Sequence, residues 1–264
     1  KVASHSTPKE TVHHTPPVTR TRERFLVLAR VAGVTTDGLR KVLEPLGKVE
    51  VIVDRIPEGD GTATAADSAG IWITNEEAEG YGGLMSKSGP FPTLTAWSRA
   101  FVHLERTLED DEAVWFVEDD VAGDPHSFAE LVRKTAARRA DLSALMLRRK
   151  RDDESWPWWG YGVAYFSDLC RGFQPLCRLG PELVRAVLEF RRAHGKFTFH
   201  EVLFPSLVRE RGMRSLEWSS EPEFRKLFPA FRYRPNVAES VRGVSHPVKD
   251  ARIHAEICSI RPPE

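Results

Sequence analysis

Short, almost entirely apolar runs alternate in this chain with segments whose apolar residues recur at helical spacing. Strands that are buried on both faces are continuously apolar, and parallel strands need a long crossover between them, usually a helix. The pattern therefore predicts an α/β fold with a mostly parallel central sheet and flanking helices. The predicted strands are 24–33, 48–55, 70–75, 113–120 and 141–148.

Helices are predicted between and after these strands. Residues 91–109 carry apolar side chains every three to four positions, which is typical of an amphipathic helix. Residues 180–195 begin with Gly-Pro and end with glycine, a common pair of helix boundary signals. The other predicted helices are 35–47, 124–140 and one that begins near residue 200.

Composition excludes some classes of function. The 264 residues contain 38 Lys plus Arg and 38 Asp plus Glu, so we expect no nucleic acid partner. No apolar run reaches the roughly 18 residues of a membrane-spanning helix, and no membrane contact is evident. We expect a cytoplasmic protein, or one of the Golgi or ER lumen if an N-terminal anchor precedes Lys1. Residues 1–22, rich in Thr, Pro and charge, are predicted to form a flexible arm.

The three cysteines do not have the spacing of a zinc site or a disulfide framework. Cys170 and Cys177 could pair in an oxidising compartment. We predict instead that both of them, and Cys258, are reduced and structural.

Three adjacent carboxylates, Glu118, Asp119 and Asp120, follow the apolar run 113–117. Burying like charges together costs several kcal/mol unless a cation neutralises them. In parallel sheets, ligands bind at the carboxyl ends of the strands, where these acids are predicted to lie. Carboxylate oxygens suit Mg²⁺ or Mn²⁺, although a turn of solvated acids is the alternative.

An acidic triplet at the end of the fourth strand of such a fold resembles the DxD-like motif of the GT-A glycosyltransferases. The resemblance covers roughly residues 24–250. It implies one domain over 23–264, with a Rossmann-like nucleotide-binding half (about 23–150) and an acceptor-binding half (about 151–264). It further implies a bound Mn²⁺ or Mg²⁺ with Asp120 as the direct ligand and Glu118 and Asp119 as supporting groups.

Two later segments fit the same resemblance. Many GT-A enzymes have a late histidine that completes the metal shell, and the sequence GVSHPVKD offers His246 for that role. Lys249 could then contact a phosphate. Inverting members use an acid at the start of a helix as general base, and Glu201 is our candidate. An ordinary loop histidine, a solvated lysine and a helix-start acid are the alternatives.

Candidates for the nucleotide are weaker, since surface Lys and Arg are plentiful. Asp54, at the end of the second strand, could accept a hydrogen bond from a uracil or ribose group. Lys87 and Arg99 could contact the base or the diphosphate. The aromatic cluster in 156–166 could stack on sugar rings as a site wall, or pack in the core.

The sequence thus favours a metal-dependent glycosyltransferase that moves a sugar from a nucleotide diphosphate donor, with UDP favoured, to a hydroxyl of a carbohydrate or glycoconjugate. A nucleotidyltransferase is a weaker alternative: it normally has a Gly-rich basic loop after its first strand, where residues 29–39 offer only Arg30 and scattered glycines. A non-catalytic carbohydrate-binding or partner-binding module remains an alternative. A paired-carboxylate glycosidase is disfavoured, because adjacent acids cannot face each other across a bond.

Overall fold

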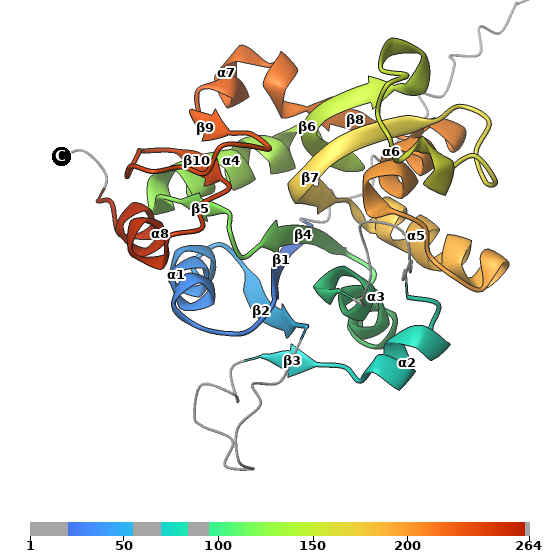
Figure 1. Cartoon of the computed structure of the whole chain (residues 1–264), viewed down its shortest axis with the longest axis horizontal. Helices are drawn as coiled ribbons and strands as arrows, with labels where there is room; N and C mark the ends of the chain where they lie inside the picture. The colour runs from blue at the N-terminus through green and yellow to red at the C-terminus, as the bar shows by residue number, and fades with distance from the viewer. Residues whose placement is uncertain (1–20, 55–69, 84–94, 262–264) are drawn as a thin grey trace, which may run out of the picture.

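The computed structural model describes residues 21–54, 70–83 and 95–261, and its centre is a seven-stranded sheet flanked by helices (Figure 1). In spatial order the strands are β3 (Ile71–Trp72), β2 (Lys48–Val53), β1 (Arg22–Ala29), β4 (Glu112–Glu118), β7 (Cys170–Leu179), β6 (Leu142–Arg149) and β8 (Ser215–Glu217). The predicted α/β class and mostly parallel sheet are confirmed. Strands from both predicted halves share this one sheet.

Strand β7 was not predicted from the sequence, and it is antiparallel to both of its neighbours, β4 and β6. Its buried Arg178 and Gln174 and its internal Pro175 break the apolar pattern. Arg178 is tolerated because Glu23 of β1 neutralises it at 2.9 Å. Proline inside a sheet is found mainly at bulges, and the pairing of β6 with β7 shifts register in this region.

Two layers of helices cover the sheet. Helices α3 (Ala96–Thr107), α5 (Pro181–His194) and α6 (His200–Glu210) pack on one face; α1 (Val34–Leu43), α4 (Pro125–Arg138) and α8 (Ala251–Cys258) pack on the other. The short α7 (Pro222–Arg225) lies beyond β8 in the chain. The predicted helices are therefore confirmed over their described residues. The predicted strand 70–75 is shorter than expected, because Asn75 already begins α2 (Asn75–Gly80) with Thr74 as its N-cap.

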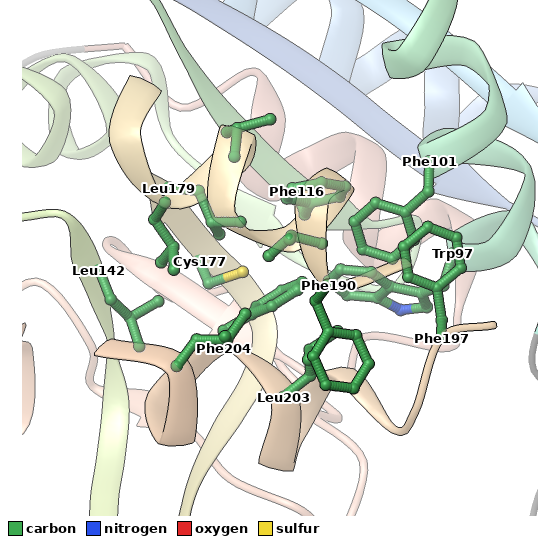
Figure 2. Close-up of a cluster of buried hydrophobic side chains, with 14 of the residues drawn as sticks. Trp97, Phe101, Phe116, Leu142, Cys177, Leu179, Phe190, Phe197, Leu203 and Phe204 are labelled. Atoms are coloured by element: carbon green, nitrogen blue, oxygen red, sulfur yellow. The ribbon is translucent and has the colours of Figure 1, made fainter. Parts of the chain in front are cut away.

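The face covered by α3, α5 and α6 has an aromatic core, shown in Figure 2. Phe116 of β4 packs against Trp97 of α3, with ring centroids 4.8 Å apart, and Phe204 of α6 adjoins both rings. Cys177 lies in this core and Cys170 is seven residues away on the same strand. An extended strand separates two such residues by about 23 Å, so they cannot form a disulfide. All three cysteines are buried and free.

A second, three-stranded sheet attaches the C-terminal part of the chain to the end of β4. It consists of β5 (Ala122–Gly123), β10 (Val244–His246) and β9 (Ala230–Phe231). Ser245 pairs with Ala122, and the carboxylate of Asp124 accepts hydrogen bonds from the backbone amides of Ser127 and Gly243. This small sheet therefore brings residues 244–249 next to the acidic triplet.

Candidate functional site

The acidic triplet lies where the order of the strands reverses. The chain runs outward from β1 through β2 to β3 and then returns to β4 on the other side of β1. Open α/β sheets bind ligands at such a switch point, beyond the carboxyl ends of the strands. Here the structure has a cleft of about 490 Å³. Its lining includes Arg30, Asp54, Trp97, Glu118, Asp119, Asp120, Phe173, Phe199, His200, Glu201, Tyr233, His246 and Lys249.

Three potential metal ligands converge in this cleft. One ligand atom from each of Glu118, Asp120 and His246 lies within 4.8 Å of the others. The Nδ1 atom of His246 faces the carbonyl oxygen of Arg232 at 2.9 Å, which requires a proton on Nδ1. In a neutral ring, Nε2 then points its lone pair at Asp120 Oδ1, 3.3 Å away. Two acceptors this close repel unless a proton or a cation lies between them, so the donor set suits a divalent cation.

The carboxyl edge of the sheet has an excess of negative charge. At the opposite edge, buried Arg24 is neutralised by Glu50 and Glu112, at 2.6 and 3.1 Å. The described lining of the cleft contains five carboxylates (Asp54, Glu118, Asp119, Asp120 and Glu201) and two permanent cations, Arg30 and Lys249, while Arg99 and Arg171 act on Asp54 and Glu201 from outside the lining. The imbalance favours the binding of a cation.

The acids of the triplet differ in their pKa. Burial and the adjacent charge of Asp120 raise the pKa of Glu118 to about 7. The hydrogen bond that Trp97 Nε1 donates to Glu118 Oε1, at 2.9 Å, opposes this rise. Burial and Asp120 also raise the pKa of Asp119. Burial alone would raise the pKa of Asp120 as well, but His246 and Lys249 outweigh it and hold this pKa below its usual value. Asp120 is therefore the acid of the triplet that ionises most readily.

Lys249 pairs with the second oxygen of Asp120. Its side chain is 59% exposed, whereas that of Asp120 is only 11% exposed. The ammonium group is thus an exposed counter-ion of Asp120 in the cleft. It lies beside the candidate metal ligands, where a phosphate group attached to a metal would also be within reach.

The residues proposed for the nucleotide fall in three different places. Asp54 follows β2 and lines the cleft, as expected for a strand-end acid. Arg99 is buried in α3 and does not belong to the lining; its guanidinium binds the carbonyl oxygen of Ile73 and donates to Asn75 Oδ1 at 2.7 Å. Lys87 lies outside the described residues.

Glu201 lies in the first turn of α6 and faces the cleft. Its Oε1 accepts a hydrogen bond of 3.4 Å from the backbone amide of Gln174. Burial raises the pKa of its carboxyl group to about 8. Neighbouring His200 stacks on Trp97 with ring centroids 3.8 Å apart, and burial lowers its pKa to about 3. His200 is therefore a neutral packing residue at physiological pH.

Several residues of the cleft have no functional signal in the sequence. Trp97 lies within the predicted amphipathic helix 91–109, and neither Phe173 nor Tyr233 belongs to a predicted element or motif. The aromatic cluster at 156–166 does not line the cleft. Trp159 and Phe166 are core residues, and Trp156 stacks on Phe199, which does line it. No local pattern marks Tyr233, whose neighbours come from strands more than 50 residues away.

Comparisons with known proteins give no assignment. No family model matches this chain, and no curated protein sequence is significantly similar to it. No helix in the part of the chain that the structure describes is long and apolar enough to cross a membrane.

Proposed function

We propose that this protein is a metal-dependent glycosyltransferase of the GT-A type, which transfers a sugar from a nucleotide diphosphate donor to a hydroxyl group of a glycan or another acceptor. The observation that carries the proposal is the convergence of Glu118, Asp120 and His246 in a cleft at the switch point of the sheet. Hard oxygen ligands with one imidazole suit Mn²⁺ better than Mg²⁺. UDP is the favoured nucleotide on the resemblance alone.

We assign each residue a role from its place in the cleft. Asp120 and His246 would hold the ion, with Glu118 as a third ligand. A bound divalent cation supplies Lewis-acid stabilisation of the charge that develops on a leaving diphosphate. Lys249 is exposed enough to turn from Asp120 toward a phosphate oxygen, while Asp54 lines the β2 side of the cleft, where the nucleoside would bind.

On the β7 side, Glu201 is the candidate general base. A buried carboxylate with a pKa of about 8 is a stronger base toward a sugar hydroxyl than an exposed one. A base on the acceptor side would favour inversion at the anomeric carbon. Retention needs no enzymic base, so inversion rests on Glu201.

A melting-temperature assay tests the proposal. We expect Mn²⁺ together with UDP to raise the melting temperature of the wild-type protein, and Asp120→Ala to abolish the shift. The matched control is Asp168→Ala, which removes a surface acid that pairs with Arg209 at 2.7 Å outside the cleft. If none of UDP, GDP and CDP stabilises the wild-type protein with Mn²⁺ or Mg²⁺, the proposal is wrong and a non-catalytic binding module gains support.

A further inference from the structure

Tyr233 presents an aromatic ring to the cleft from the segment after β9. Its ring centroid lies 3.8 Å from that of Phe173 in β7, and 46% of the residue is exposed. Since one side of the ring rests on Phe173 and the residue still lines the cleft, another part of the ring is open to a ligand. Most Trp, Phe and Tyr residues in the described part of the chain are buried or half-buried, so an exposed aromatic ring that lines the cleft is unusual in this protein.

Buried Arg171 and its partners hold the side chain of Tyr233 in place. Arg171 Nη1 donates to the Tyr233 hydroxyl at 3.2 Å. The Arg171 side chain is 9% exposed and is fixed by Asp153, whose Oδ2 accepts from Nε at 2.6 Å, and it lies over the ring of Trp156, 5.5 Å from the centroid. The position of Tyr233 is therefore determined before any ligand binds, which lowers the entropy lost on binding.

The same side of the cleft lacks cationic groups. Its described lining residues from β7, α6 and the Tyr233 segment are Phe173, Pro175, Phe199, His200, Glu201 and Tyr233. None of these described residues is lysine or arginine, and the positive charge of Arg171 is neutralised by Asp153. The cations Arg30 and Lys249 come instead from the loop after β1 and the segment after β10. An anionic ligand on this side would therefore meet no lysine or arginine of the described lining.

We propose that Tyr233 is the stacking platform of a subsite for an uncharged pyranose, the acceptor unit, whose hydroxyl group faces Glu201. The apolar face of a sugar ring stacks on an aromatic ring, and the hydroxyl groups at its edge reach polar partners. Burial raises the pKa of Tyr233, and Glu201 is close enough to add to this rise. The naming of this sugar as the acceptor rests on the proposed glycosyltransferase function.

Matched pairs of glycosides test the subsite. The probes are methyl glucoside with methyl glucuronide, and methyl galactoside with methyl galacturonide, followed by saturation-transfer NMR with Mg²⁺ and UDP present. Within each pair, the uronide carries a carboxylate where the neutral glycoside carries a hydroxymethyl group. We expect the neutral member of at least one pair to bind at least about tenfold more tightly than its uronate partner, which is a difference of about 1.4 kcal/mol.

Three variants locate the binding. Tyr233→Ala should weaken binding of the neutral glycoside at least about tenfold, whereas Tyr233→Phe should keep it within about threefold because the stacking ring remains. The control is Trp72→Ala, which removes a partly exposed aromatic ring on β3 outside the cleft and should change nothing. A uronate that binds as well as its neutral partner, no binding of any neutral glycoside, or wild-type binding by Tyr233→Ala would overturn the subsite.

The two proposals fail separately. If neutral glycosides bind through Tyr233 but no nucleotide stabilises the protein, the transferase function is wrong and a sugar-binding module remains. If Mn²⁺ with UDP stabilises the protein while Tyr233→Ala binds glycosides like the wild-type protein, the subsite is wrong and the transferase function stands.

Discussion

The ammonium group of Lys249 pairs with Asp120 Oδ2, while His246 Nε2 lies 3.3 Å from Oδ1 of the same carboxylate. Asp120 is thus approached from both sides by groups of the segment after β9. Lys249 provides positive charge at the place where a metal ion would provide it. The lysine should therefore compete with the ion as long as no phosphate draws it away.

Replacement of Lys249 by methionine should tighten Mn²⁺ binding in the absence of nucleotide. Mn²⁺ must displace the Lys249 ammonium group from the Asp120 carboxylate, and two unit charges about 4 Å apart in a water-like environment interact by about 1 kcal/mol. We therefore expect the Kd for Mn²⁺ to decrease about fivefold in the variant. Titration with Mn²⁺, followed by electron paramagnetic resonance of the free ion, measures this. The control is Lys226→Met, because Lys226 is similarly exposed (61%) and pairs with Glu130 outside the cleft. An unchanged Kd would show that Lys249 does not compete with the ion.

The raised pKa of Glu118 predicts a pH-dependent stability in the absence of metal. Its folded value of about 7 exceeds the ordinary value of 4.5, so between these values the folded state holds a proton that the unfolded state has lost. The resulting stabilisation is complete below about pH 4.5 and is lost as the pH rises through 7. Glu118→Gln keeps the acceptor for Trp97 without the charge. At pH 8, with a chelator present to remove metal ions, Glu118→Gln should be more stable than the wild-type protein.

This advantage of Glu118→Gln should shrink as the pH falls toward 5, and urea unfolding at several pH values measures it. Added Mn²⁺ should stabilise the wild-type protein more than the variant, because the amide is the poorer ligand. Glu239→Gln, at an exposed position, is the control and should follow the wild-type curve. A constant difference between Glu118→Gln and the wild-type protein at every pH would contradict the prediction.

If Glu201 is the general base, turnover should follow its ionisation. Its pKa of about 8 means that the carboxyl group is mostly protonated at neutral pH, so turnover should rise as the pH increases through 8. Glu201→Gln should lower turnover at least about 100-fold and remove this rise, while donor binding persists. Steady-state rates between pH 6 and 9, together with nucleotide titration, measure both effects. Near-normal turnover in the variant would remove Glu201 from the mechanism.

Most of the fold could be predicted from the sequence because its signals are local. Apolar runs and helical spacing are decided within a dozen residues, and they located β1, β2, β4, β6 and the longer helices. Strand β7 depends on long-range partners instead: its buried Arg178 is stable only because Glu23 lies beside it, 155 residues away in the chain. A charged residue with a distant counter-ion has the same local pattern as a surface loop.

The residues of the site likewise differ in whether a local sequence pattern indicates their position. The acidic triplet marks a strand end, so its place at the sheet edge could be predicted. The proximity of His246 to Asp120 depends on the pairing of β10 with β5, and only the resemblance to GT-A enzymes suggested it. Tyr233 acquires its position from Arg171 and Phe173, about 60 residues earlier, and nothing near it in the sequence indicates this.

Arg99 gives a test of the sequence hypothesis against the observed contacts. Its guanidinium joins α3 to the start of α2 through Ile73 and Asn75. Hydrogen bonds from a charged group contribute about 1.5–3 kcal/mol each, so Arg99→Lys should lower the melting temperature by several degrees. The affinity for UDP with Mn²⁺ should remain within about twofold. Differential scanning calorimetry and nucleotide titration compare it with Arg106→Lys, an exposed arginine on the same helix that pairs with Glu77 at 3.1 Å. An unchanged melting temperature with a nucleotide Kd raised tenfold would instead support the direct donor contact that the sequence suggested.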